Sequence, residues 1–262
     1  MSKLPVLLSI PHGGTKRPPE LDGHLCLTER DKFDDSDPYV VEIYDLDDEV
    51  QSVIKTDIAR AFVDLNRSLY DLPPKNPDGL IKSSTCYEKP IYLNGREPDE
   101  SLRKMLIEMY YKPYHRAIQK DIHELDLQLC LDCHSMASFA PNVSPDGNKK
   151  KRPAFCLSNQ DGRTCSKEMI ELLAEHIQES FSLEKYEVQI NSPFKGGHIT
   201  QTYGNNPIPW IQIEMNRDLY LSQEWFDYDT LTIDRTRLLQ LNDIFKKMLT
   251  KFCNECFGEE IA

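Results

Sequence analysis

Short apolar runs alternate along the chain with longer segments that carry an apolar residue every three or four positions. Apolar runs bounded by proline, glycine or polar residues predict strands, and the longer spacing predicts amphipathic helices. These criteria predict strands at 5–11, at 53–67 (two short strands or one bent strand), and at 127–135, 154–159, 186–192 and 210–216. They predict helices starting near residue 37, at 99–125 with an interruption near Pro113, at 166–181 and at about 234–257.

The order of these elements indicates the fold class. Strands that alternate with helices are typical of a three-layer α/β/α sandwich with a mixed, mostly parallel central sheet. No internal repeat, low-complexity tract or linker interrupts the alternation. We therefore expect residues 1–262 to form a single domain, which is within the size that one α/β domain reaches.

Polar and ionisable residues follow the predicted strands, where ligands bind in folds of this kind. His12 follows the first strand, in the sequence "PHGG", whose glycines let the backbone approach another group closely. Asn66 and Arg67 close the second strand region, and His134 closes the third. Glu214, with Asn216 and Arg217 after it, closes the last strand.

Two histidines and a carboxylate on separate loops predict a zinc site with an open position for water. We expect His12 and His134 to be the histidines. The carboxylate comes either from the acidic cluster Asp34, Asp35 and Asp37 or from Glu214. Acidic residues are also favoured at an exposed helix start, which is the alternative explanation of the cluster.

Glu214 lies in an apolar strand, where an unpaired carboxylate is costly. It is either paired with an arginine such as Arg217 or faces a site as a general base with a raised pKa. Arg60 and Arg67 have the bidentate geometry to bind a substrate carboxylate or polarise a carbonyl. Salt bridges to the abundant acidic residues are the alternative for both arginines.

Composition excludes several classes of function. A net charge of −12 argues against nucleic acid as a partner, and the single basic run, 147–152, predicts a solvated loop. No apolar run is long enough to cross a membrane, and the N-terminus lacks a signal-peptide core, so we expect a cytoplasmic protein. Eight cysteines in 262 residues are too few for a disulfide scaffold and predict reduced thiols.

Two further features have alternative explanations. Residues 70–97 are rich in proline, glycine and polar residues and predict a long loop, either a flap over the site or an excursion without function. Cys130 and Cys133 suggest half of a zinc knuckle. They are three apart on a strand and therefore point to opposite faces, which favours packing instead.

The motifs "SIPHGG", "SDPYVVEIYD", "RAFVDLNR", "DCHSM", "FKGGHITQTYG" and "IQIEMNRDLY" occur in this order over nearly the full chain. In this combination the sequence resembles the N-formylglutamate amidohydrolase family, a branch of the zinc carboxypeptidase and aspartoacylase superfamily. The resemblance implies a zinc-carboxypeptidase-like sandwich with a sheet of about eight strands, and a cytoplasmic enzyme of histidine degradation. It implies Zn²⁺ as cofactor and a small N-acyl amino acid as substrate.

The resemblance also implies roles for individual residues. Zinc would be bound by His12, Asp37 and His134, and Glu214 would be the general base. Arg60 would stabilise the oxyanion, Asn66 and Arg67 would clamp the substrate carboxylate, and we expect Arg217 to contact the substrate as well.

Three positions depart from the pattern of the family or superfamily. Thr15 stands where the superfamily more often has a glutamate ligand, three residues after the first histidine. Gln201 stands where an arginine is expected, and His198 replaces an aromatic residue. Because of Gln201 and His198, the sequence does not specify the amino-acid part of the substrate.

The leading hypothesis is a zinc amidohydrolase that cleaves an N-acyl amino acid such as N-formyl-L-glutamate. A carboxypeptidase or a peptidoglycan amidase, acting on a larger substrate, is the enzymatic alternative. A noncatalytic protein that binds a small acid is the alternative of a different class, and the retention of His12, His134 and Glu214 together argues against it. The oligomeric state does not follow from the sequence.

Overall fold

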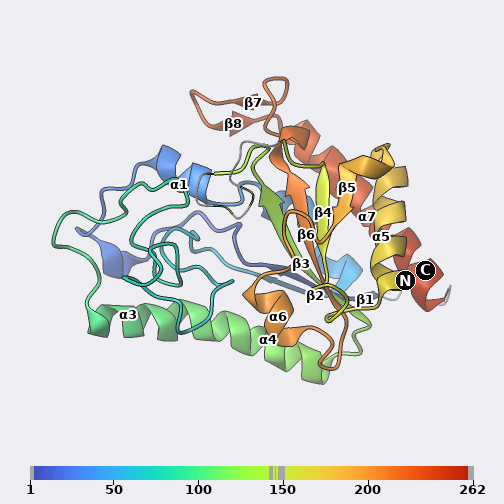
Figure 1. The fold of residues 1–262 in the computed structure, drawn as a ribbon, viewed down its shortest axis with the longest axis horizontal. Helices are drawn as coiled ribbons and strands as arrows, with labels where there is room; N and C mark the ends of the chain where they lie inside the picture. The colour runs from blue at the N-terminus through green and yellow to red at the C-terminus, as the bar shows by residue number, and fades with distance from the viewer. Residues whose placement is uncertain (1–2, 142–143, 145, 147–150, 259–262) are drawn as a thin grey trace.

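The computed structural model describes residues 3–141, 144, 146 and 151–258. They form a central six-stranded sheet with helices on both of its faces (Figure 1). The sheet contains, in sequence order, β1 (Leu4–Ile10), β2 (Val50–Lys55), β3 (Leu129–Met136), β4 (Phe155–Ser158), β5 (Val188–Ile190) and β6 (Trp210–Asn216). The three-layer α/β/α prediction is confirmed.

The strands lie in the order β2-β1-β3-β6-β4-β5. Neighbours from β2 to β6 are parallel, β4 is antiparallel to β6, and β4 and β5 are parallel to each other. The sheet is therefore mixed and mostly parallel, with six strands rather than the expected eight or so. The two remaining strands, β7 (Phe226–Asp227) and β8 (Thr232–Ile233), form a separate hairpin that the sequence pattern did not predict.

The helices are distributed over the two faces of the sheet. The longer ones are α4 (Lys112–Glu124), α5 (Lys167–Phe181) and α7 (Arg235–Phe257), and the shorter ones are α1 (Glu29–Asp35), α2 (Val40–Tyr44), α3 (Glu100–Leu106) and α6 (His198–Tyr203). One face packs against α2, α5 and α7, and α4 and α6 lie over the other (Figure 1). Short 3₁₀ turns occur at Pro19–Leu21, Asp47–Glu49, Lys185–Glu187 and Arg217–Leu219.

The central strand β3 buries alternate residues in two different hydrophobic cores. Leu129, Leu131 and Cys133 pack in the core under α2, α5 and α7, whereas Cys130 packs in the core on the α4 and α6 side. The two cysteines therefore point to opposite faces, as predicted, and all eight cysteines are free thiols.

The predicted helix at 99–125 is present, with its interruption before Pro113. A single π-helical turn at Ile107–Tyr111 joins α3 to α4. Proline lacks an N–H and its ring clashes with the preceding turn, and a π-bulge is one of the ways in which a helix accommodates such a disturbance. The observed element is one interrupted helix.

The segment 29–44 differs from the predicted helix that starts near Asp37. Thr28 and Asp31 form a capping box that starts α1 eight residues earlier, and α1 ends at Asp35. Proline disfavours a helical conformation in the residue before it, which explains why Asp37 and Pro38 lie between α1 and α2. The carboxylate of Asp37 is thereby free to turn inward.

The predicted strand pair at 53–67 was also partly wrong, because β2 ends at Lys55 and turns follow it. The buried carboxylate of Asp64 accepts a hydrogen bond from the backbone of Asn66 at 3.0 Å, which is a side-chain turn rather than strand pairing. Asn66 and Arg67 therefore reach the sheet edge through a loop. The short helix α6, which the sequence pattern did not predict, precedes β6.

Residues 70–97 contain no helix or strand, as predicted, and some of their side chains, among them Leu80, Ile81 and Ile91, pack in the core. Of the basic run, residues 147–150 lie outside the described residues. The prediction of a solvated loop is wrong for Arg152, which is buried and paired with Asp146 at 2.7 Å. Within the described ranges, none of the helices has both the length and the apolar character that crossing a bilayer requires.

We predict that Gly14→Ala destabilises the fold by about 2 kcal/mol or more, because overpacking against backbone has that cost. A Cβ at Gly14 would lie 2.3 Å from the backbone oxygen of Ile58, which cannot move without shifting the turn. Urea unfolding measures the loss. Thr15→Ala, at the exposed neighbouring position, is the control, and equal stability of the two variants would contradict the prediction.

Candidate metal centre

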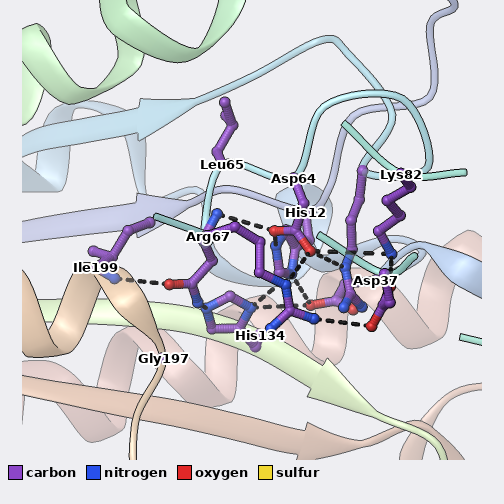
Figure 2. A network of polar contacts seen from close by, with 12 residues as sticks. His12, Asp37, Asp64, Leu65, Arg67, Lys82, His134, Gly197 and Ile199 are labelled. Carbon is purple, nitrogen blue, oxygen red and sulfur yellow. Dashed lines mark hydrogen bonds and ion pairs between the residues drawn. The ribbon is translucent and has the colours of Figure 1, made fainter. Parts of the chain in front are cut away.

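His12, Asp37 and His134 come together at the carboxyl end of the sheet (Figure 2). His12 follows β1, His134 belongs to the neighbouring strand β3, and Asp37 reaches in from the segment between α1 and α2. His134 Nδ1 lies 3.1 Å from His12 Nδ1 and 3.2 Å from Asp37 Oδ2, and His12 Nδ1 lies 3.4 Å from that oxygen. All three side chains are buried.

The other nitrogen of each imidazole faces a buried carboxylate. His12 Nε2 lies 2.8 Å from Asp64 Oδ1, and His134 Nε2 lies 3.1 Å from Asp132 Oδ1. An ionised carboxylate only accepts hydrogen bonds, so each Nε2 carries a hydrogen, and a ring that binds a metal is neutral and presents its lone pair at Nδ1. With a metal bound, two nitrogen lone pairs and a carboxylate oxygen would therefore point at one position.

This arrangement fits a bound metal ion. Three acceptors at such short range repel one another unless a proton or a metal cation lies between them. Donors bound to tetrahedral zinc at ~2.0–2.1 Å are about 3.3–3.4 Å apart, close to the observed 3.1–3.4 Å separations. Carboxylates behind the ligating histidines are the usual second partners in zinc sites.

Arg217 holds the third acceptor in place. Its Nη2 donates to Asp37 Oδ1 at 3.1 Å and its Nε to Ser135 Oγ at 3.1 Å, so Asp37 Oδ2 is left to face the histidines. Burial raises the pKa of Asp37, but hydrogen bonds from His12 and His134, with the charge of Arg217, hold it well below its ordinary value. Arg217 thus contacts protein groups in this structure, and its expected contact with substrate stays a prediction.

The sequence analysis did not assign roles to Asp64 and Asp132. Asp132 is fully buried and accepts hydrogen bonds from Ser9 Oγ at 3.1 Å and Thr200 Oγ1 at 3.2 Å. The position of Asp132 beside His134 could have been predicted from their spacing, because residues two apart on a strand share a face. The position of Asp64 could not, since a turn after β2 brings it to His12.

Glu214 lies beside His134, because the two residues are direct partners in the register of β6 and β3. It is only 8% exposed, and Gln212 Nε2 donates to its Oε1 at 2.9 Å. Burial raises the pKa of Glu214 to about 7; the charge of His134 opposes this rise and that of Asp37 adds to it. Among the described residues, no salt bridge joins Glu214 to an arginine, and its role as a general base stays a prediction.

Asn66 connects the site to α6. Its Oδ1 accepts from the backbone N–H of Ile199 at 2.7 Å, and its Nδ2 lies 3.4 Å from Asp132 Oδ2. A Cβ at Gly197 would lie 2.4 Å from Asn66 Nδ2, so the glycine allows the close approach. The role of Asn66 in binding substrate stays a prediction.

The two remaining predicted arginines converge on Asp64. Arg60 Nε donates to Asp64 Oδ2 at 3.1 Å, and Arg67 Nε lies 3.4 Å from the same oxygen. The side chain of Arg67 is 30% exposed, compared with 17% for Arg60 and 13% for Arg217. Arg67 is therefore the arginine with the most access to a substrate, and the oxyanion role of Arg60 stays a prediction.

Comparison with known proteins gives consistent results. A family model described as N-formylglutamate amidohydrolase matches residues 4–221. The chain is 30% identical over 236 residues to N-formylglutamate deformylase of Pseudomonas putida, covering 86% of this chain and 85% of that protein. It is 29% identical over 231 residues to N-formylglutamate deformylase of Pseudomonas aeruginosa, covering 85% and 84% respectively.

Two solved structures share the fold. An N-formylglutamate amidohydrolase from Ralstonia eutropha superposes with a TM-score of 0.79 at 21% identity, covering 97% of this chain and 95% of that one. A gene product from Agrobacterium tumefaciens superposes with a TM-score of 0.68 at 17% identity, covering 97% and 91%. At these identities the structures support the three-layer fold.

We predict that Glu214→Gln stabilises the metal-free protein at alkaline pH. The pKa of Glu214 rises from an ordinary 4.5 to about 7 on folding, so the folded state is favoured at low pH and loses this advantage as pH rises through 7. Removing the charge should restore up to about 3 kcal/mol at pH 8 and much less at pH 5. Urea unfolding of the metal-free protein at both pH values measures the difference.

The exposed Glu42→Gln is the control and should show no such pH dependence. An equal effect of Glu214→Gln at pH 5 and pH 8 would show that the carboxylate ionises as easily in the folded chain as in the unfolded one.

Proposed function

The chain belongs to the N-formylglutamate amidohydrolase family, and we propose that it hydrolyses the amide bond of an N-formyl amino acid such as N-formyl-L-glutamate. The products are formate and the free amino acid. The observation that carries the proposal is the set of three acceptor atoms of His12, Asp37 and His134 that face one another beside Glu214. The deformylase activity named for the two Pseudomonas relatives supports the choice of substrate class.

Zn²⁺ is the proposed cofactor, held by Nδ1 of both histidines and Oδ2 of Asp37. When bound, zinc polarises the amide carbonyl and lowers the pKa of water, which makes hydrolysis possible at neutral pH. The donor set of two imidazoles and one carboxylate is the one that hydrolytic zinc enzymes use. Arg217, Asp64 and Asp132 hold the three ligand side chains in the required orientation.

Glu214 is the proposed general base. Its carboxylate accepts a proton from the attacking water and passes it to the amino group that leaves. A base works best when its pKa is near the operating pH, and the pKa of about 7 for Glu214 fits this role. Gln212 orients the carboxylate through the hydrogen bond to its Oε1.

Arg67 is the proposed partner of the substrate carboxylate, since its guanidinium is the most exposed of the three arginines around the site. Asn66 lies next to it, and its amide fixes the start of α6 and with it the position of His198. Arg60 is the proposed group that stabilises the oxyanion. The side chain of the substrate amino acid stays open, because Gln201 and His198 depart from the family pattern.

Metal removal and replacement test the proposal. After treatment with a chelator, the protein should release no formate from N-formyl-L-glutamate, and about one zinc ion per chain should restore the reaction. His134→Ala should lower kcat/KM at least about 100-fold, because a ligand is lost. The exposed His123→Ala is the matched control and should retain wild-type activity.

Formate release by the metal-free protein at the rate of the zinc-loaded protein would refute the proposal. Comparison of N-formyl-L-glutamate with N-acetyl-L-glutamate, N-formyl-L-glutamine and longer peptides identifies the acyl group and the side chain. Faster hydrolysis of the peptides would favour the carboxypeptidase or amidase alternative.

We predict that kcat/KM falls with decreasing pH along a limb that lies below about pH 7. The base must be ionised to accept a proton, and protonation of Glu214 below its raised pKa of about 7 removes it. The positive charge of a bound metal shifts this limb of the profile to lower pH. In Glu214→Gln the remaining activity should lack the limb, and a variant profile that keeps it would assign the limb to another group.

A further inference from the structure

Lys82 is a fully buried lysine in the long loop 70–97, and the proposed reaction does not use it directly. Its side chain has no exposed surface, although lysine is rarely buried completely. A buried ammonium is very costly unless it is paired and hydrogen-bonded. The position of Lys82 is therefore set by its partners.

Three carboxylates surround the ammonium group. Lys82 Nζ lies 2.6 Å from Asp78 Oδ1, 3.0 Å from Asp35 Oδ2 and 4.0 Å from Asp64 Oδ2. Asp78 belongs to the same loop, whereas Asp35 and Asp64 belong to two other segments. Figure 2 shows Lys82 reaching toward Asp64 from the side opposite His134.

The two other segments are the ones that supply the metal-site groups. Asp35 is the last residue of α1 and stands two residues before Asp37. Asp64 accepts the hydrogen bond from His12 Nε2. The other oxygen of Asp35 accepts from the backbone N–H of Cys86 at 2.7 Å, which ties the same loop a second time to the segment of Asp37.

We propose that Lys82 is a positioning residue that sets zinc affinity, by joining the segment that carries Asp37 to the carboxylate that orients His12. This inference rests on the proposed function and adds a residue to it. Loop 70–97 is then neither a flap nor an excursion without function. It places the ammonium group of Lys82 beside Asp35 and Asp64, behind the ligands of the proposed metal.

A purely structural role is the competing explanation. Asp35, Asp64 and Asp78 are matched by three cations, Lys82, Arg60 and Arg67. On that explanation Lys82 only balances buried charge, and any change that restores the balance restores the protein completely. On the positioning explanation, restored balance recovers stability but not zinc affinity.

The double variant Lys82→Met/Asp35→Asn separates the two explanations, because it removes one positive and one negative charge together. The single variant Lys82→Met leaves a buried carboxylate unbalanced and should be less stable than the double variant. Lys89→Met, at an exposed position of the same loop, is the control. For each protein we would measure urea unfolding without metal, zinc affinity by competition with a chromophoric chelator, and kcat and KM separately.

We expect the double variant to unfold at a urea concentration close to that of the wild type and to bind zinc about 10- to 100-fold more weakly, the range found for groups behind metal ligands. At subsaturating zinc its kcat should fall while KM stays unchanged, because Lys82 does not contact the substrate. Wild-type zinc affinity in the double variant, or its failure to fold, would overturn the proposal and assign Lys82 to the fold alone.

The outcomes also separate this inference from the proposed function. A wild-type protein that binds no zinc would contradict both. A wild-type protein that binds zinc but releases no formate would contradict only the proposed reaction, and the zinc affinities would still decide the role of Lys82.

Discussion

Three acceptor atoms that face one another in the protein interior are the constraint on which the site depends. The two Nδ1 atoms and Asp37 Oδ2 lie 3.1–3.4 Å apart, and the other nitrogen of each imidazole faces a buried carboxylate. Without a positive charge between them, such groups repel one another. Most of the polar structure around the sheet edge serves to hold them in place against that repulsion.

The support comes from both sides of the acceptor group. Arg217 binds Asp37 from one side, and on the other side Asp64 connects His12 to Arg60, Arg67 and Lys82. Buried charges are tolerated only when they are paired, and here the pairs extend from one side chain to the next. Each charged side chain in this series orients the next one. A substitution of Lys82 is therefore expected to affect the orientation of His12, although Lys82 does not contact His12.

The fold and the residues nearest the proposed metal could be predicted from the sequence, for reasons that are local. The periods of apolar residues define β1, β3, β6 and the long helices, and parallel strands place their carboxyl ends at one edge, where His134 and Glu214 lie. The residue pattern alone did not decide which carboxylate binds the metal, and the resemblance to the family selected Asp37.

What could not be predicted depends on contacts between distant segments. Asp64 meets His12 across 52 positions, and Lys82 meets Asp35 across 47, through loops whose path no periodicity specifies. The capping box at Thr28 and Asp31, which leaves Asp37 free between two helices, is a local signal that places a helix start before the predicted one near residue 37. Asn66 was expected at the end of a strand and lies in a turn made by Asp64.

X-ray absorption at the zinc edge of the reconstituted protein tests the central claim most directly. Coordination by His12, Asp37 and His134 predicts only nitrogen and oxygen ligands at ~2.0–2.2 Å, with the multiple scattering of two imidazole rings. His134→Ala should reduce this to one ring. Sulfur ligands at ~2.3 Å, or a spectrum without imidazole, would place the metal elsewhere and contradict the account.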